Sequence, residues 1–395
     1  AHTGVSNCPL PSQLGKKWHK VLTGDSTGDI WSSPVVAGGV VYVGTNASTG
    51  DLYAFDADDG TELRHITLDS PIHGTPCVAD GRVYVGTERG PGGAGEGTLY
   101  ALYAADQQGH STLDMDWTFE CDSADHIWGS PVVHGGAVYF GTSTLWPSGP
   151  DSGCLYTVDL TTRSKRITPP PTISYGVRYP TPAIDASFAG GARCYVSDFS
   201  CYLTAFDCST GECVWEWRAD DAAMFSSPSV YDGYVFVGSG DNRVYRLADS
   251  LVAIGAYEGT NALVYAGDFS PTASVYSTIT TLGGRLYFGC EDERVYAVDS
   301  DTLSQVWQSA ALGSAVTSSS AISAPTGVLF TATSNGSIIA FDAETGDHLW
   351  QFNLHDPLGE NWTTAQIKSS PAIANDRLFI VAGDGSERRL YFFGP

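Results

Sequence analysis

One position in a repeated segment of this chain carries side chains with unusual chemistry. The segment recurs eight times, about 40–55 residues apart, and the position lies two residues before a Ser or Thr in every copy. We call this position the variable column, and its occupants are Trp31, His73, Trp128, Tyr179, Phe225, Tyr276, Thr317 and Lys368. Aromatic rings bind flat apolar molecules, and imidazole and amine groups transfer protons. The variable column therefore predicts a ligand site, provided that its side chains face one space.

Each residue type in the variable column has an expected role. We expect His73 and Lys368 to handle protons, and Tyr179 and Tyr276 to donate hydrogen bonds to a carbonyl or a developing oxyanion. The other members are expected to stack on a ligand or contact it: Trp31, Trp128, Phe225 and Thr317. The alternative is that large side chains only plug a channel or pack as core. Lys368 fits that alternative worst, because an unpaired buried ammonium group is costly.

The repeat that carries the variable column predicts a β-propeller. Each copy contains four short runs of β-branched and aromatic residues bounded by Gly or Asp, and repeats of this kind are typical of propeller blades. The final run, Arg389–Phe393, has no successor, and Lys16–Val21 matches the missing strand. We therefore expect an all-β, eight-bladed propeller of four-stranded antiparallel blades, forming a single domain over residues 1–395. Residues 16–22 would complete the last blade with residues 367–395 and remove its open edge.

Two neighbouring positions are expected to be structural. The residue before the variable column is mostly aliphatic, and strand alternation sends it into the packing between blades while the column residue faces the channel. A nucleophile would not be needed eight times, so we expect the recurring hydroxyls to cap backbone groups near the channel. These hydroxyl residues are Ser33, Thr75, Ser130, Thr181, Ser227, Thr278, Ser319 and Ser370. Asp125 and His126, just before Trp128, are expected in a solvated loop near the rim.

Composition excludes some classes of partner. The formal net charge is −24, from 20 Lys and Arg against 44 Asp and Glu. Nucleic acid is therefore excluded as a partner, because its phosphates require a basic surface. The chain contains no apolar run of the 18 or more residues that a membrane span needs, so none is expected. The expected partner is a hydrophobic or aromatic small molecule.

Cysteines and glycosylation sequons point to the secretory pathway. Cys208 and Cys213 flank one predicted turn, and Cys194 and Cys201 flank another, so each pair is a disulfide candidate. Three sequons fall in predicted loops, at Asn46, Asn335 and Asn361. Together these features predict a secreted glycoprotein, although the odd total of nine cysteines leaves at least one thiol outside any intrachain pair.

A second motif in the repeats resembles a motif of a known propeller family. The stretch Ala340–Trp350 reads Ala-x-Asp-x-x-Thr-Gly-x-x-x-Trp, and it resembles the tryptophan-docking motif of quinoprotein-like propellers, which include PQQ-dependent alcohol dehydrogenases and the scaffold BamB. The resemblance covers nearly the whole chain and implies that a Trp of each blade docks on its neighbour. The third and fifth copies lack this Trp, and the first has Arg64 in its place, so those contacts should differ.

The resemblance leaves three functions open. A PQQ-dependent dehydrogenase would hold its quinone with calcium and a disulfide between adjacent cysteines, and no Cys-Cys pair occurs here, although PQQ with calcium is not excluded. A BamB-like scaffold or another non-catalytic ligand-binding propeller is the second. The third is a cofactor-free cyclase, since the overall plan is similar to that of secreted fungal hetero-Diels–Alderase propellers. In that reading, which we prefer, the variable column forms a quinone methide and orients it for cyclisation.

Overall fold

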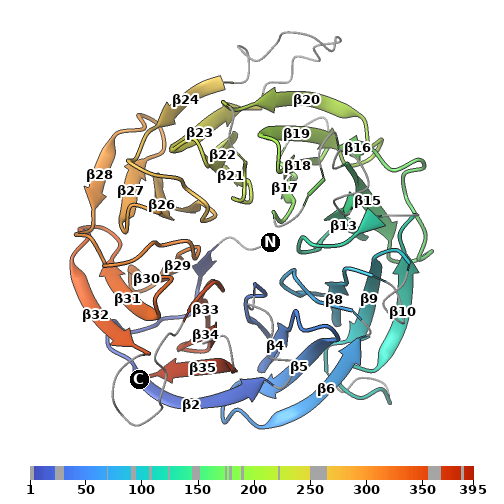
Figure 1. Cartoon of the computed structure of the whole chain (residues 1–395), viewed down its shortest axis with the longest axis horizontal. Helices are drawn as coiled ribbons and strands as arrows, with labels where there is room; N and C mark the ends of the chain where they lie inside the picture. The colour runs from blue at the N-terminus through green and yellow to red at the C-terminus, as the bar shows by residue number, and fades with distance from the viewer. Residues whose placement is uncertain are drawn as a thin grey trace.

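Short strands joined by tight turns form eight radial sheets around a common central axis (Figure 1). The structure is a computed structural model, and it describes residues 4–22, 31–68, 70–89, 95–105, 109–122, 125–144, 152–173, 176–177, 180–187, 191–220, 223–249, 265–354, 366–383 and 387–395. Each blade is an antiparallel meander whose strands follow one another from the channel outward. The predicted fold class is confirmed. None of the described segments is a helix long and apolar enough to cross a membrane.

Blades 1 to 4 occupy the first half of the chain. From the channel outward, blade 1 contains β3 (Val35–Ala37), β4 (Val40–Gly44), β5 (Gly50–Asp56) and β6 (Glu62–Leu68), and blade 2 contains β7 (Cys77–Ala79), β8 (Arg82–Gly86), β9 (Thr98–Tyr103) and β10 (Met115–Glu120). Blade 3 contains β12 (Val132–His134), β13 (Ala137–Gly141), β15 (Gly153–Asp159) and β16 (Thr172–Ile173), and blade 4 contains β17 (Ala183–Asp185), β18 (Arg193–Ser197), β19 (Tyr202–Asp207) and β20 (Cys213–Arg218). A separate two-stranded ribbon joins β11 (Asp125–His126) to β14 (Ser143–Thr144) between blades 2 and 3.

Blades 5 to 8 complete the ring. Blade 5 contains β21 (Ser229–Tyr231), β22 (Tyr234–Ser239), β23 (Arg243–Ala248) and β24 (Tyr265–Phe269), and blade 6 contains β25 (Thr280–Leu282), β26 (Arg285–Gly289), β27 (Val295–Asp299) and β28 (Gln305–Gln308). Blade 7 contains β29 (Ala321–Ser323), β30 (Val328–Ala332), β31 (Ser337–Asp342) and β32 (His348–Asn353), and blade 8 contains β33 (Ala372–Ala374), β34 (Arg377–Gly383), β35 (Arg388–Gly394) and β2 (Gly15–Leu22). A short extra strand, β1 (Val5–Ser6), lies on the channel side of blade 7.

The ring is closed by the predicted N-terminal strand. Strand β2 pairs antiparallel with β35 as the outermost strand of blade 8. Trp18 of β2 packs on Phe392, with ring centroids 5.1 Å apart, and its indole covers Gly60 in the turn of blade 1. A Cβ on Gly60 would lie 2.6 Å from that indole. The tryptophan therefore bridges the last blade and the first one.

Contacts between other blades follow the residue at the docking position. The ring of Trp307 in blade 6 covers Gly346 of blade 7, and its Nε1 donates a hydrogen bond of 3.0 Å to the Ala343 carbonyl. In blade 1 the same position holds Arg64, which instead forms an ion pair of 2.6 Å with Asp114 of blade 2. The expected difference in blade contacts is therefore present.

The extra strand β1 was not predicted from the sequence. Its neighbour Gly4 accepts a hydrogen bond of 2.6 Å from the Ile322 backbone, and Gly4 lines the central cavity. Gly4 has a φ of +66°, and a Cβ there would lie 2.2 Å from the Thr280 hydroxyl oxygen. The N-terminal segment thus supplies part of the channel wall at a place that only glycine fits.

The predicted disulfides are wrong for this structure. All nine cysteines lie in described residues and are free thiols. Cys194 belongs to the core between blades 3 and 4, whereas Cys201 belongs to the core between blades 4 and 5, so the two lie on opposite faces of their sheet. Cys208 is buried while Cys213 is exposed. The prediction of a secretory setting now rests on the sequons alone.

Candidate functional site in the central channel

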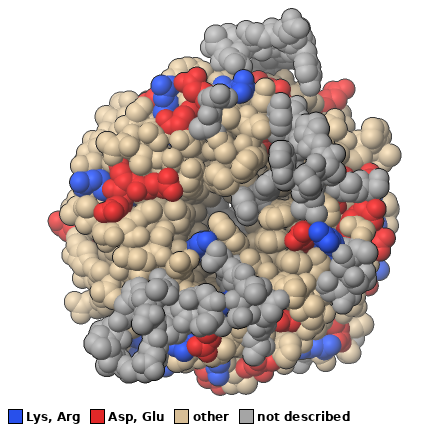
Figure 2. Space-filling view, in the orientation of Figure 1, with Lys and Arg blue, Asp and Glu red and all other residues tan. Residues whose placement is uncertain are grey.

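A cavity of about 480 Å³ occupies the centre of the propeller, and all eight blades contribute to its wall. Figure 2 shows the hollow on one face, with acidic side chains spread over the outer part of that face. Seven members of the variable column line the cavity: Trp31, His73, Trp128, Phe225, Tyr276, Thr317 and Lys368. Tyr179 lies outside the described residues. The structure thus brings together every described residue of the column, while their roles stay predictions.

The side chains face the cavity because their neighbours are buried between blades. Ile72 and Ile127 precede His73 and Trp128, and both are fully buried. A Cβ on Gly44, at the end of β4, would lie 2.5 Å from the Ile72 side chain. Because successive side chains of an extended backbone point to opposite sides, the column residue that follows each of these isoleucines points into the channel.

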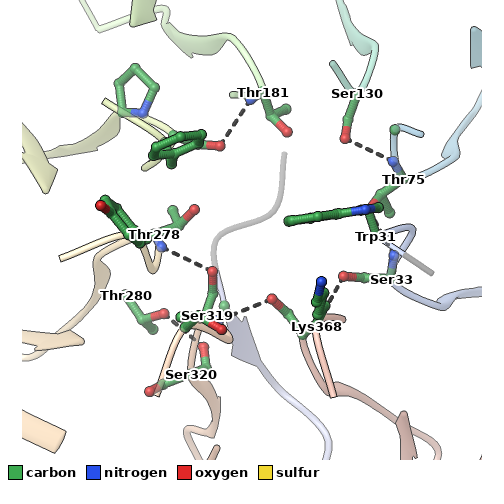
Figure 3. Close-up of a pocket in the computed structure, with 18 of the residues that line it drawn as sticks. Trp31, Ser33, Thr75, Ser130, Thr181, Thr278, Thr280, Ser319, Ser320 and Lys368 are labelled. Atoms are coloured by element: carbon green, nitrogen blue, oxygen red, sulfur yellow. Dashed lines mark hydrogen bonds between the residues drawn. The ribbon is translucent and has the colours of Figure 1, made fainter. Parts of the chain in front are cut away.

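The recurring hydroxyls form a ring of hydrogen bonds that we call the hydroxyl girdle (Figure 3). At six junctions in the described part of the chain, a girdle residue donates its backbone N–H to the hydroxyl of the corresponding residue in the next blade, over 2.9–3.0 Å. One of these bonds, from Ser370 to Ser33, joins the last blade to the first. The predicted capping role is confirmed, and the girdle holds the inner ends of the blades at a constant spacing.

His73 forms the most defined polar contact of the cavity. Its Nε2 lies 3.3 Å from Oε2 of Glu88, and the two side chains are only 11% and 16% exposed. Its ring is stacked on Trp128, with centroids 4.2 Å apart and planes 8° apart. The hydrogen bond with His73 lowers the pKa of Glu88 below its usual value. Glu88 is therefore an anion at neutral pH and can stabilise a protonated His73.

The ribbon of β11 and β14 supports this pair. Asp125 and His126 are both buried, so the expectation of a solvated loop is wrong. Asp125 accepts hydrogen bonds from the Tyr156 hydroxyl, at 2.7 Å, and from the Thr142 hydroxyl, at 3.1 Å. Nδ1 of His126 is hydrogen-bonded to the backbone carbonyl of Glu88. These bonds satisfy the polar groups of a segment that the sequence alone marked as a loop.

Lys368 and Trp31 meet at the junction of blades 8 and 1. The ammonium nitrogen of Lys368 lies 4.7 Å from the centroid of the Trp31 ring, within cation–π range. Trp31 is 39% exposed and projects toward the middle of the cavity with Lys368 beside it (Figure 3). A cation and an aromatic face are therefore presented to a ligand together.

Blades 5 to 7 supply further aromatic and polar side chains. Phe225 meets Tyr276 edge to face, with centroids 4.8 Å apart, and it meets Phe199 in the same way at 5.3 Å. The hydroxyls of Thr317 and Ser334 lie 3.4 Å apart. This part of the cavity can hold an aromatic ring while hydroxyl groups contact its substituents.

A second column of residues at the cavity was missed in the sequence. In an alignment of the repeats it stands two residues after the position that Gly44 occupies in blade 1, and its members are Asn46, Glu88, Ser143, Phe199, Gly240, Glu291, Ser334 and Gly383. Glu291 and Ser334 line the cavity, and Glu88 and Phe199 contact column residues. Aligning the repeats on this strand would have revealed a second variable position.

The sequon asparagines differ in surroundings. Asn46 is half-buried, whereas Asn335 is exposed and accepts a hydrogen bond of 2.7 Å from Thr333. Asn361 lies outside the described residues. Glycosylation at these positions stays a prediction, and Asn335 offers the more accessible acceptor.

The described residues do not fit a quinone held by a metal ion. A metal of that kind needs several oxygen ligands, and the described lining contains one carboxylate, Glu291. Within the described part of the chain, no three His, Cys, Asp or Glu side chains are grouped to hold a metal ion. We therefore derive no step through such a cofactor.

Fold and cavity together define an eight-bladed β-propeller with an asymmetric central site. The profile of the family described as outer membrane protein assembly factor BamB, a PQQ-repeat family, matches residues 15–168, 180–253 and 249–392. The chain belongs to this family, which confirms the predicted quinoprotein-like resemblance. No curated protein sequence matches the chain.

Solved structures show the same fold at low sequence identity. BamB from Moraxella catarrhalis has a TM-score of 0.67 at 15% identity, over 96% of this chain and 99% of that one. The quinohemoprotein alcohol dehydrogenase ADHIIG from Pseudomonas putida HK5 has a TM-score of 0.69 at 15% identity, over 96% of this chain and 76% of that one. Sqt1 from Saccharomyces cerevisiae has a TM-score of 0.66 at 12% identity, over 95% and 98% of the two chains. These proteins share the architecture.

Proposed function

We propose that the central cavity binds a flat, largely apolar small molecule that carries oxygen groups, and that the protein catalyses a cofactor-free cyclisation of the hetero-Diels–Alder type. One observation carries the proposal: the variable column, which differs from blade to blade, surrounds one cavity of about 480 Å³. That volume lies within the usual range for small-molecule sites, roughly 300–1,000 Å³. A column that only plugged the channel would leave no such space.

The polar groups suit formation of an ortho-quinone methide from a precursor with a hydroxymethyl group beside a phenol. The phenol loses its proton to His73, whose cationic form Glu88 stabilises, and Lys368 protonates the departing hydroxyl group. The benzylic C–O bond breaks and water leaves, so no oxidant is required. Nδ1 of His73 has no hydrogen-bond partner among the described residues, so it is the ring nitrogen left to accept a proton while Nε2 faces Glu88.

The aromatic groups suit the second step, in which the quinone methide meets an alkene. One C–C bond and one C–O bond form together, and no proton or electron is left over. Trp31 and the Phe225–Tyr276 pair can stack on the two partners and hold them in a reactive arrangement. Orientation of this kind can supply much of the rate acceleration of a two-component reaction.

The test combines binding and turnover. The purified protein is incubated with an ortho-hydroxybenzyl alcohol and an electron-rich alkene, and chiral chromatography measures the rate and enantiomeric excess of the dihydropyran. We expect one enantiomer to dominate, and His73→Ala to return the racemic background. His65→Ala is the matched control, because His65 is a half-exposed histidine on the outer strand β6.

Binding is measured separately by quenching of tryptophan fluorescence. Saturable binding without any enantiomeric excess would overturn the catalytic proposal and leave a ligand-binding propeller. Absence of saturable binding by any aromatic precursor would overturn the site itself and favour a scaffold.

A further inference from the structure

We propose that His126 is a positioning residue that holds Glu88 in place, so that Glu88 can in turn orient His73. The inference rests on the proposed function, in which His73 handles a proton. His126 is not in contact with His73 in any described interaction; it acts through the peptide group of Glu88. Its side chain is buried, so it contributes to the site from behind the cavity wall.

The contact between His126 and Glu88 adds to the hydrogen bonds that already hold the neighbouring residues Thr87 and Arg89. Glu88 stands two residues beyond the end of β8, and its backbone N–H donates to the Pro71 carbonyl over 3.1 Å. Nδ1 of His126 engages the carbonyl of the same residue. Because a carbonyl oxygen only accepts, Nδ1 must carry the proton in this bond. The two bonds set the direction in which the carboxylate leaves the backbone.

His126 is itself held firmly by the ribbon. Its neighbour Asp125 accepts two hydroxyl hydrogen bonds, and the Asp125 carbonyl accepts a backbone hydrogen bond of 2.6 Å from Gly97. A Cβ on Gly97 would lie 2.7 Å from the Ile127 nitrogen, so the ribbon approaches blade 2 as closely as backbone allows. The imidazole of His126 is thus a rigid support.

The same ribbon also sets the plane of the His73 ring. Trp128 follows His126 by two residues, and it is the ring on which His73 stacks at 4.2 Å. One segment therefore positions both members of the pair: His126 places the carboxylate of Glu88, and Trp128 places the imidazole of His73. Positioning at this scale matters, because a displacement of about 1 Å can cost a catalytic site roughly 100-fold in rate.

The charged and titratable groups that act on Glu88 are His73, Arg89 and His126, and all three lower the pKa of its carboxyl group. The strongest influence is the hydrogen bond with His73, while Arg89 approaches the other carboxylate oxygen at 3.6 Å. A variant at position 126 therefore removes both a titratable ring and a hydrogen bond, and the experiment must separate the electrostatic effect of the ring from the effect of the bond.

Two substitutions separate them. His126→Asn removes the titratable ring but keeps an N–H donor near the place of Nδ1, whereas His126→Leu removes both. His65→Leu is the matched control, because it removes a half-exposed histidine of the outer strand β6 that contacts neither Glu88 nor the ribbon in any described interaction. Carbon-13 NMR of glutamate-labelled protein reports the carboxyl pKa of Glu88, with the signal assigned from a Glu88→Gln variant.

We expect the pKa of Glu88 to rise toward its usual value in His126→Leu and to stay low in His126→Asn and His65→Leu. In the cyclisation assay, His126→Leu should lower kcat roughly 10-fold to 100-fold with little change in KM, and Asn should restore it. If His126→Asn and His126→Leu raise the pKa of Glu88 equally, the effect comes from the charge of the ring and the positioning role of His126 is refuted. An unchanged pKa of Glu88 in His126→Leu also refutes that role. The NMR measurement does not require turnover. It therefore tests the role of His126 even if the protein shows no cyclisation activity, and failure of the proposed function is distinguished from failure of this inference.

Discussion

The contact between His73 and Glu88 should have a measurable free energy that disappears in acid. His73→Phe preserves a flat ring against Trp128 while removing both nitrogens, and Glu88→Gln preserves the shape of the side chain while removing its charge. A double-mutant cycle built from these variants isolates the interaction of the pair from the separate effects of each substitution.

The structure sets the expected size of this interaction. The two atoms lie 3.3 Å apart, and both side chains are less than one-fifth exposed, so solvent screens the pair less than it would on the surface. Hydrogen bonds to charged groups contribute about 1.5–3 kcal/mol, whereas exposed ion pairs contribute about 0.2–1 kcal/mol. We therefore expect a coupling free energy of about 1.5–3 kcal/mol at pH 6.

The sign of the pH dependence follows from Glu88. Its pKa is lowered in the folded protein, so its contribution to stability is fully present above the usual glutamate pKa of about 4.3. That contribution is lost as the pH falls through the lowered value. Urea unfolding of the four proteins between pH 6 and pH 3 measures the coupling. A coupling near zero at pH 6, or one that is unchanged in acid, would refute the hydrogen bond between His73 and the ionised carboxylate of Glu88.

Three further predictions concern the closure of the ring, the girdle and the cysteines. Gly60→Ala should destabilise the protein by about 2–4 kcal/mol in urea unfolding, because the added Cβ meets Trp18 and the φ of Gly60 is +73°. Gly38→Ala is the control: its φ is +58° with open space around it, so the loss should be only about 1–2 kcal/mol. Equal losses in the two variants would argue against the docking of Trp18 on Gly60. Ser370→Ala should cost about 1–3 kcal/mol by leaving the Ser319 N–H without its acceptor, and a neutral effect would show that the girdle is dispensable. Thiol titration in denaturant without reductant should find nine thiols per chain, and a lower number would restore the disulfide prediction.

The features that the sequence predicted correctly are those encoded many times. The aliphatic residues at Ile72 and Ile127, the hydroxyls of the girdle and the strand around Trp18 each occupy a position that recurs from blade to blade. Alignment of the copies separates such positions from chance, because the same packing problem is solved in each blade. The direction of the variable column toward the channel follows from this register.

Apart from the second column, which recurs in each blade, the features that were missed or wrong are encoded once. Strand β1 depends on the contact of Gly4 with blade 7, and the burial of His126 depends on a carbonyl 38 residues away in sequence. The disulfide candidates Cys208 and Cys213 were inferred from spacing around a turn, but the turn places one thiol inside and the other outside. No local pattern distinguishes these outcomes, since each is decided by tertiary contacts.

The arrangement explains how a repeated fold can hold an asymmetric site. The girdle residues differ only between Ser and Thr, and they carry the hydrogen bonds that keep the blades in register. The described residues of the variable column line the same cavity as the girdle and neither donate nor accept any of its six bonds, so their side chains can change without disturbing the ring. His73 and Glu88 show the consequence, because one residue from each column forms the pair within a single blade. Substitutions in the girdle should therefore change stability first, and substitutions in the columns should change ligand binding first.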